Sequence, residues 1–525
     1  MGNTLITDNK NSIHQEHITM GERVHRSIVN VRVGLLFYLL SLFLAFFSRK
    51  VFLDCLGAEF IGLTGTLSNI LNFLNVAELG IGTGITYFLY KPLQSDNKQQ
   101  VNEIMSVLAY LYRMIGIIIC VAGLSVSLAF PFIFEHQEIS LPLIYFTFYS
   151  FLCSSALGYI LNYKQLLVSA NQRQFLVNIC FQTIGILQSL TQIAIAWYYQ
   201  NLYLYVVVGL IYTILGCIIF NSYIDRVYPW LKVEPSKGRA LLKVYPDILK
   251  KSRQVFVQRI KDFILYRSDQ MLVFMFVSLK MVAFYDNYMI IVNKFIYLVN
   301  ILSDGMNAGI GNLIAEGNKK NTMKVFWELT AIRFIILGVI LFSFLLFIQP
   351  FVCCWIGEEY LLENLIVYLI VINLFIMLSR GVVEMYISAC GLFGDVWAAW
   401  TELALNLIFT FALAPFLGIK GILLGKIISI FFIALFWKPY YLFTHGLHER
   451  YSTYWRGMLP YYLIFFGFIA LSLCLQSFTS PLIQGYSDLF LYGCITLLPL
   501  LLVYLLVLYL FTSGMKYFVA RLHRR

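Results

Sequence analysis

Long apolar runs separated by short polar stretches make up most of this 525-residue chain. About 20 apolar residues are enough for a helix to cross the hydrocarbon core of a bilayer. Runs of that length predict about fourteen spans. They lie near residues 28–48, 61–90, 104–130, 142–168, 175–198, 203–222, 254–279, 284–314, 326–349, 362–390, 396–417, 420–443, 459–478 and 486–512. The residues are 60% hydrophobic and only 12% charged, whereas a soluble domain of this size needs a more polar surface. We therefore expect an all-α polytopic membrane protein.

Lysine and arginine collect in alternate loops, and this alternation sets the expected orientation. One side of the membrane receives, among others, Lys91, Lys98, Lys164, Arg173, Lys319, Lys320, Lys324, Lys438, Arg450 and the tail residues Lys516, Arg521, Arg524 and Arg525. Cytoplasmic loops hold the excess of positive charge in membrane proteins. We therefore expect a bacterial cytoplasmic (inner) membrane, both termini in the cytoplasm and an even number of spans. These loops also account for the net charge of +11, so we expect no nucleic-acid partner.

The longest cytoplasmic connection divides the expected spans into groups. Residues 224–252 carry three prolines and seven lysines or arginines. We expect residues 1–222 to form an N-terminal six-helix bundle and residues 223–253 to form a basic cytoplasmic linker. A second six-helix bundle is expected over 254–443, followed by two further spans and a basic tail over 444–525.

One polar segment of the second span recurs in the second half of the chain. Residues 74–85 read LNVAELGIGTGI, and residues 299–310 read VNILSDGMNAGI. Asn75, Gly80, Gly84 and Ile85 match Asn300, Gly305, Gly309 and Ile310, and an acid, Glu78 in the first copy and Asp304 in the second, precedes the first glycine of each. Glycines at this spacing let helices approach closely in lipid, so we expect these residues to serve helix packing or gating. The repeat predicts two pseudo-symmetric bundles. On a regular helix Glu78 points away from the other polar residues of its span, so it either contacts a neighbouring helix or is re-aimed by a distortion at the glycines.

The expected seventh span carries a stripe of charged and polar side chains. Arg259, Asp262, Tyr266 and Asp269 share an arc of roughly 100° with Gln270 when the residues are placed on a helix. Ionisable residues inside a membrane normally mark a substrate path. We therefore expect this stripe to line a hydrated substrate cavity. Arg259 and Asp262 have a second interpretation, since they also lie near the cytoplasmic headgroups, where long side chains snorkel.

The expected tenth span repeats this pattern. Asn373, Arg380 and Glu384 lie within about 40° of one another on a helical wheel. They either line the substrate cavity, or Arg380 and Glu384 form an i, i+4 ion pair that merely holds helices together. Lys294 lies in the middle of the eighth span, which favours a cavity role. Single charges also occur at Arg32, Arg113, Arg333, Glu402 and Lys426. Arg32 and Arg333 open their spans, so we expect them at the membrane interface.

Sequence motifs of nucleotide-driven, hydrolytic or metal chemistry are missing. The sequence holds no G-x-x-x-x-G-K-[ST], no G-x-S-x-G and no H-E-x-x-H. None of the seven histidines is central to a span, and the ten cysteines show no C-x-x-C spacing. We therefore expect no enzyme activity, no catalytic residue, no metal site and no cofactor. Any energy coupling must use the substrate gradient or an ion gradient, with Na⁺ and H⁺ as the candidate ions.

Three segments in the first half and three in the second resemble a known family. FIGLTG at 60–65, AELGIG at 77–82 and YKPL at 90–93 resemble the second helix of bacterial polysaccharide exporters. SDQMLV at 268–273, YDNY at 285–288 and NAGIGNLIA at 307–315 resemble their seventh and eighth helices. These exporters are the O-antigen and capsule repeat-unit flippases of the MATE-related (multidrug/oligosaccharidyl-lipid/polysaccharide) superfamily. The resemblance covers most of residues 28–443, although Gln270 stands where asparagine is more usual in the family.

The resemblance implies a substrate and a mode of action. It implies two six-helix bundles around a central cavity, two extra C-terminal helices and alternating access. The implied substrate is a polyprenyl-diphosphate-linked oligosaccharide, flipped for the assembly of capsule, exopolysaccharide or the O-antigen of lipopolysaccharide. The implied partners are this lipid, the bilayer and other polysaccharide assembly proteins. Basic groups at Arg259, Lys294 and Arg380 suit phosphate oxygens, and Asp262, Asp269 and Glu384 would keep them partly paired when no substrate is bound.

Two other functions fit the sequence less well. A cation-coupled multidrug exporter of the same architecture would favour cavity acids without cavity bases, whereas this chain combines both. A membrane polysaccharide polymerase or ligase usually needs a large external loop for its acceptor, and the external loops expected here are all short.

Overall fold

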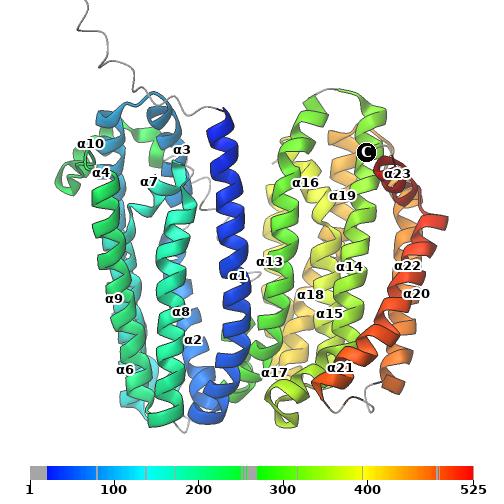
Figure 1. Ribbon diagram of the computed structural model, residues 1–525, viewed down its shortest axis with the longest axis horizontal. Helices are drawn as coiled ribbons and strands as arrows, with labels where there is room; N and C mark the ends of the chain where they lie inside the picture. The colour runs from blue at the N-terminus through cyan, green and yellow to red at the C-terminus, as the bar shows by residue number, and fades with distance from the viewer. Residues whose placement is uncertain are drawn as a thin grey trace, which may run out of the picture. The chain divides into compact units, whose positions relative to one another are not determined.

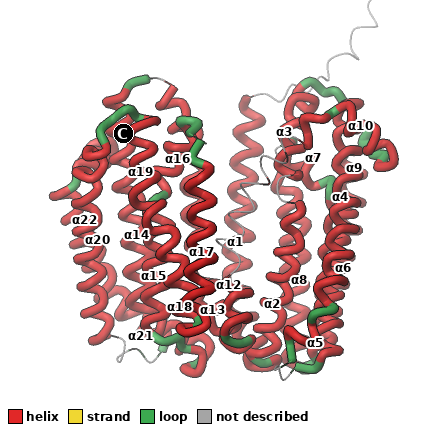
Figure 2. Tube along the Cα trace, turned by 180° about the vertical axis from the view of Figure 1, so that it is seen from behind, coloured by secondary structure: helices red, strands yellow, loops and turns green. Residues whose placement is uncertain are grey.

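The computed structural model describes residues 20–78, 81–135, 139–171, 173–249, 252, 256, 269–315, 317–392, 394–479, 483 and 485–523. Every regular element within these ranges is helical, as the tube in Figure 2 shows. The predicted all-α class is therefore confirmed.

Contacts between helices divide the chain into two units. The first unit comprises Met1–Leu56 and Ile70–Ile260, and the second comprises Gly57–Asn69 and Lys261–Arg525. The division falls inside one helix, α2 (Ala58–Leu74), so this helix contributes to both units. The predicted bundle boundaries at residues 222 and 254, and the pseudo-symmetry of the bundles, stay predictions.

The first unit is built around α4, one face of which is buried. Its elements are α1 (Met20–Leu56), the end of α2, a 3-10 turn (Asn75–Glu78), α3 (Ile81–Gln94), α4 (Lys98–Ser127), α5 (Phe130–Ile133), α6 (Leu141–Asn162), α7 (Gln165–Ala170), α8 (Gln174–Tyr199), α9 (Leu202–Val227), a second 3-10 turn (Pro235–Lys237) and α10 (Gly238–Val244) (Figure 1). α6 packs on α4 and on α9, and α8 packs on α1 and on α9.

The second unit is built around α14, which is buried along most of its length. Its elements are the start of α2, α12 (Asp269–Phe276), α13 (Leu279–Ala315), α14 (Lys319–Ile356), a 3-10 turn (Glu358–Tyr360), α15 (Asn364–Ser379), α16 (Gly381–Ala389), α17 (Val396–Leu417), α18 (Ile419–Phe432), α19 (Lys438–Tyr441), α20 (Tyr451–Thr479), α21 (Tyr486–Tyr492), α22 (Leu498–Phe511) and α23 (Ser513–Leu522) (Figure 1). Short π-helical segments at Ile433–Trp437, Leu442–Gly446 and Gly493–Leu497 continue α18, α19 and α21.

Eleven helices within the described ranges are long and apolar enough to cross a membrane. They match all of the expected spans except those near 61–90, 254–279 and 284–314. The span near 61–90 is interrupted, because the 3-10 turn at Asn75–Glu78 separates α2 from α3. The chain is a polytopic membrane protein, and the total of about fourteen spans stays a prediction.

The basic linker is folded onto the first turns of α4. The backbone N–H of Lys232 donates to Asn102 Oδ1 at 3.0 Å, and that of Glu234 donates to Ser106 Oγ at 3.0 Å. Tyr245 closes the segment by donating its hydroxyl to Glu103 Oε2 at 2.6 Å. Burial, and then this carboxylate, raise the pKa of Tyr245 to about 12. The linker is thus an ordered part of the first unit.

Close packing of α17 against α18 depends on two glycines. A Cβ at Gly421 would meet the backbone of Leu413 and Ala414, and one at Gly425 would meet the backbone of Thr410 at 2.7 Å. The absence of side chains at these positions lets the two helices approach closely, as small residues do in membrane interiors. This approach brings the charged residues of α17 and α18 into the interior of the second unit.

The helices after α19 add an aromatic layer to α14. Phe334 and Phe342 of α14 contact Phe465 of α20 with ring centroids 6.0 and 5.5 Å apart. Tyr504 of α22 lies 5.0 Å from Phe342, and its hydroxyl donates to the carbonyl of Phe334 at 2.9 Å. Aromatic pairs at these distances stabilise packing beyond the area they bury, so α20 and α22 are firmly attached to α14.

Candidate functional site: charged groups buried in the second unit

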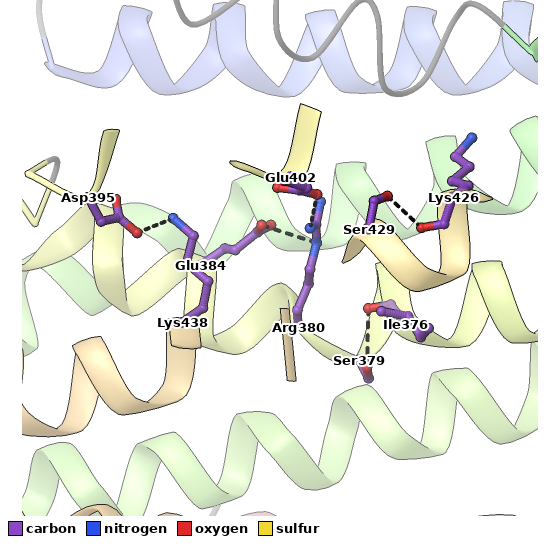
Figure 3. A network of polar contacts seen from close by, with 9 residues as sticks. All are labelled: Ile376, Ser379, Arg380, Glu384, Asp395, Glu402, Lys426, Ser429 and Lys438. Carbon is purple, nitrogen blue, oxygen red and sulfur yellow. Dashed lines mark hydrogen bonds and ion pairs between the residues drawn. The ribbon is translucent and has the colours of Figure 1, made fainter. Parts of the chain in front are cut away.

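Arg380 lies at the joint between α15 and α16 and faces two glutamates. Its Nε is 3.1 Å from Oε1 of Glu384, one turn later, and its Nη1 is 3.4 Å from Oε1 of Glu402 on α17 (Figure 3). The side chains of Arg380 and Glu402 are only 9% and 3% exposed, whereas that of Glu384 is 46% exposed. The i, i+4 pair considered from sequence therefore exists, and a third, buried charge accompanies it.

A second arginine lies close to this group. Arg333 of α14 is 7% exposed, and its Nη2 donates to Ser303 Oγ of α13 at 2.9 Å. Its guanidinium lies against the backbone of Gly381, where a Cβ would overlap it. The expected position of Arg333 at the membrane interface stays a prediction. Its hydrogen bond to Ser303 and its burial show that it is packed between helices instead of extended toward water.

Asp269 and Lys426 form a second buried pair. Lys426 Nζ of α18 is 2.7 Å from Asp269 Oδ2 at the start of α12, and each side chain is 12% exposed. Tyr285 of α13 donates its hydroxyl to the same carboxylate oxygen at 3.1 Å. Burying either charge alone is costly, so the pair and the hydroxyl stabilise each other. The cavity role predicted for Asp269 stays a prediction, because its carboxylate is here bonded to protein groups.

A chain of amides continues from this pair toward α2. Asn69 Nδ2 donates to the side-chain oxygen of Gln270, and Gln270 Nε2 donates in turn to Asp286 Oδ1. These bonds connect α2, α12 and α13. Gln270 is thus a connecting residue whose amide uses both its donor and its acceptor.

The remaining residues predicted for the cavity differ in their surroundings. Asn373 donates to the carbonyls of Leu369 at 3.0 Å and Leu423 at 3.2 Å, so it ties α15 to α18. Lys294 is half-buried on α13. Arg259, Asp262 and Tyr266 lie outside the described residues.

The repeated segment has different backbone conformations in its two copies. Asn75 and Glu78 lie in the 3-10 turn, where Asn75 Oδ1 accepts from Ser155 at 2.9 Å and Glu78 Oε1 accepts from Tyr112 at 2.7 Å. Glu78 therefore contacts a neighbouring helix, α4, which is one of the two alternatives left open by the sequence.

The second copy is continuous helix. Asn300, Asp304, Gly305 and Gly309 all lie within α13, and Asn300 is exposed. In the first copy, Gly84 lies in α3, and Gly80 is outside the described residues. The packing or gating role of these positions stays a prediction.

Metal and disulfide chemistry find no support in the described ranges. No group of three or more His, Cys, Asp or Glu side chains there could hold a metal ion, and the ten cysteines are free.

Sequence reasoning named Glu402, Lys426 and Arg333 only as single charges and missed their partners. A signal was present, because a charge in the middle of an apolar span requires a counter-charge from another span. The sequence does not say which spans are neighbours, so Glu402 was not assigned to Arg380 or Lys426 to Asp269.

Comparisons with known proteins identify the fold. No family model matches the chain, and no curated protein matches its sequence. The lipid II flippase MurJ, in an inward closed conformation, has a similar structure, with a TM-score of 0.65, 14% identity and coverage of 92% of this chain and 98% of that one.

Two transporters of another kind are also similar. An inward-facing multidrug resistance MATE transporter of the MOP superfamily has a TM-score of 0.58 and 12% identity, and covers 78% of this chain and 97% of its own. The Vibrio cholerae MATE transporter VcmN, in a mutant form, has a TM-score of 0.50 and 15% identity, with coverage of 81% and 99%. The chain is therefore a polytopic membrane protein with a fold similar to those of the MATE transporters and of the lipid II flippase MurJ.

Proposed function

We propose that this chain is a flippase for polyprenyl-diphosphate-linked oligosaccharides, which it moves across a bacterial cytoplasmic membrane for surface polysaccharide assembly. The observation that carries the proposal is buried Arg380 within one unit of this fold, paired with buried Glu402 and with the more exposed Glu384. The similarity to MurJ over 92% of the chain supports it, since MurJ is a flippase for lipid II. The short motifs shared with polysaccharide exporters point to the same class.

The chemistry of the head group fits this site. A lipid diphosphate is anionic, and a guanidinium offers paired donors to phosphate oxygens. An arginine that is 9% exposed needs counter-charges when no substrate is bound, and Glu384 and Glu402 supply them. When the diphosphate replaces one carboxylate, it binds one conformation of the protein more tightly than another. Alternating access requires such a difference in affinity.

Three further features belong to the proposal. Both termini lie in the cytoplasm, where the basic loops collect. Where transport is coupled to an ion gradient, the coupling ion is Na⁺ or H⁺. Other polysaccharide assembly proteins receive the flipped lipid.

A cation-coupled multidrug exporter is the second candidate, because two of the similar structures are MATE transporters. Such a site favours acids that lack a fixed base. The four acids described as buried in the second unit, Asp269, Glu328, Asp395 and Glu402, each have a base within 4.0 Å, namely Lys426, Arg521, Lys438 and Arg380. This pairing favours an anionic substrate.

The test replaces Arg380 in cells that depend on this chain for surface polysaccharide. Arg380→Ala is expected to abolish export at normal protein level and to leave lipid-linked oligosaccharide on the cytoplasmic side. Arg380→Lys is expected to retain part of the activity, because it keeps the charge but loses the paired contact. Lys420→Gln is the matched control, since Lys420 pairs with Glu363 at 2.6 Å in a more exposed setting. Export at wild-type level by Arg380→Ala would remove the assignment.

A further inference from the structure

Arg333 packs against the residue that directly follows Arg380. Arg333 of α14 lies so close to Gly381 that a Cβ there would overlap its Nη2 and Cζ atoms. Arg380 is the residue directly before Gly381. The missing side chain of Gly381 therefore lets the Arg333 guanidinium pack against the backbone of the residue that follows Arg380.

Each arginine is bound by a group on another helix, Ser303 of α13 for Arg333 and Glu402 of α17 for Arg380. Ser303 accepts from Arg333 at 2.9 Å and donates its own hydroxyl to the carbonyl of Val299 at 2.8 Å. Glu402, with a side chain only 3% exposed, lies 3.4 Å from Arg380. A carboxylate buried this deeply cannot leave its partner without a large desolvation cost.

Glu384 is the counter-ion that can leave. It lies 3.1 Å from Arg380 Nε. Its side chain is 46% exposed, whereas that of Glu402 is 3% exposed, so Glu384 regains hydration more easily when it rotates away. Rotation of Glu384 therefore makes the Nε donor of Arg380 accessible, next to the residue against which Arg333 packs.

We propose that Arg333 and Arg380 together form a diphosphate-binding site, in which the ligand takes the place of Glu384 while Glu402 remains bound to Arg380. The proposal rests on the function proposed above and adds Arg333 as a second binding residue. Two guanidiniums match two phosphates, because each can bind one phosphate through paired donors. A monophosphate engages fewer of these donors and binds more weakly.

The test measures binding of inorganic pyrophosphate and of farnesyl diphosphate to the full-length protein in lipid nanodiscs, with farnesyl monophosphate for comparison. Arg333→Ala and Arg380→Ala are each expected to weaken diphosphate binding by about tenfold or more. Glu384→Gln is expected to strengthen it by up to about fivefold, because the competing charge is gone. Glu363→Gln, the partner of Lys420, is the control and leaves binding unchanged.

The two ligands separate two sources of diphosphate. The expected pattern with farnesyl diphosphate supports a lipid-linked ligand, and the same pattern with pyrophosphate alone supports a free one. Unchanged binding in Arg333→Ala, or unchanged or weaker binding in Glu384→Gln, would contradict the proposed diphosphate-binding site. If thermal unfolding shows that Arg333→Ala does not fold, Arg333→Lys replaces it, with a smaller loss of affinity expected.

The experiments distinguish an error in the proposed diphosphate-binding site from an error in the proposed flippase function. If diphosphates bind with the expected pattern but the protein moves no lipid-linked oligosaccharide in proteoliposomes, the diphosphate-binding site is supported and the flippase function is contradicted. If the lipid is moved while Arg333→Ala binds diphosphate like wild type, the diphosphate-binding site is contradicted and the flippase function is supported.

Discussion

The four acids described as buried in the second unit each lie within 4.0 Å of a base from another helix or helix end. Lys426 and Asp269 are separated by 157 positions yet lie 2.7 Å apart. Glu402 and Arg380 join α17 to the joint between α15 and α16. Such pairs contribute little net stability compared with apolar packing, but breaking one by removing a single partner is strongly destabilising. They therefore fix which helices are neighbours.

Lys426→Ala tests this at the residue scale. The variant leaves Asp269 buried without its base, and we expect a loss of about 3 kcal/mol or more in unfolding free energy. The thermal midpoint in detergent should fall clearly. The double variant Lys426→Ala with Asp269→Asn should recover part of the loss, because the unpaired charge is gone. Equal midpoints for the single and double variants would show that the two residues are not coupled.

The residue scale also shows where prediction from sequence ends. Arg380 and Glu384 are four positions apart on one helix, so their pairing follows from helix geometry alone. Glu402 of α17 contacts Arg380, and Arg333 of α14 packs against Gly381. No pattern within a single helix indicates these contacts between helices. Their assignment requires the packing of the second unit.

Helices of this chain were predictable where they are uniformly apolar. The eleven helices long and apolar enough to span a membrane all lie at expected positions. The interruption between α2 and α3 was not expected as a break, although its polar residues were noticed. The break at Asn75–Glu78 exposes side chains to partners on α4 and α6, such as Tyr112 and Ser155. Tertiary hydrogen bonds of this kind override a local helix pattern.

Gly425→Ala tests helix packing at the element scale. A Cβ at Gly425 would lie 2.6 Å from Thr410 Oγ1 and 2.7 Å from the Thr410 backbone nitrogen, so α17 and α18 must move apart. We expect a lower thermal midpoint and a weaker Lys426–Asp269 pair. Gly467→Ala on α20 is the matched control, because nothing lies within 4 Å of its added Cβ and alanine favours a helix by about 1 kcal/mol. A fall in both variants would contradict the packing argument.

Orientation in the membrane belongs to the scale of the whole molecule. The alternation of basic loops predicts that Lys98, Lys243 and Arg525 all face the cytoplasm. Reporter fusions at these three positions should each give a cytoplasmic signal. The ordered contact between the linker and α4, through Tyr245 and Glu103, requires Lys98 and Lys243 to agree. An external signal at Lys243 would overturn both the predicted orientation and the division of spans at the linker.

Transport of a diphosphate-linked lipid is the central claim, and reconstitution tests it most directly. Purified protein in proteoliposomes is given a fluorescent polyprenyl-diphosphate oligosaccharide, a monophosphate analogue and, separately, an organic drug cation. We predict that the wild type moves the diphosphate lipid between leaflets, moves the monophosphate analogue more slowly and leaves the cation where it is, and that Arg380→Ala moves none of them. Movement of the cation with no movement of the diphosphate lipid would contradict the proposed function and favour a multidrug exporter.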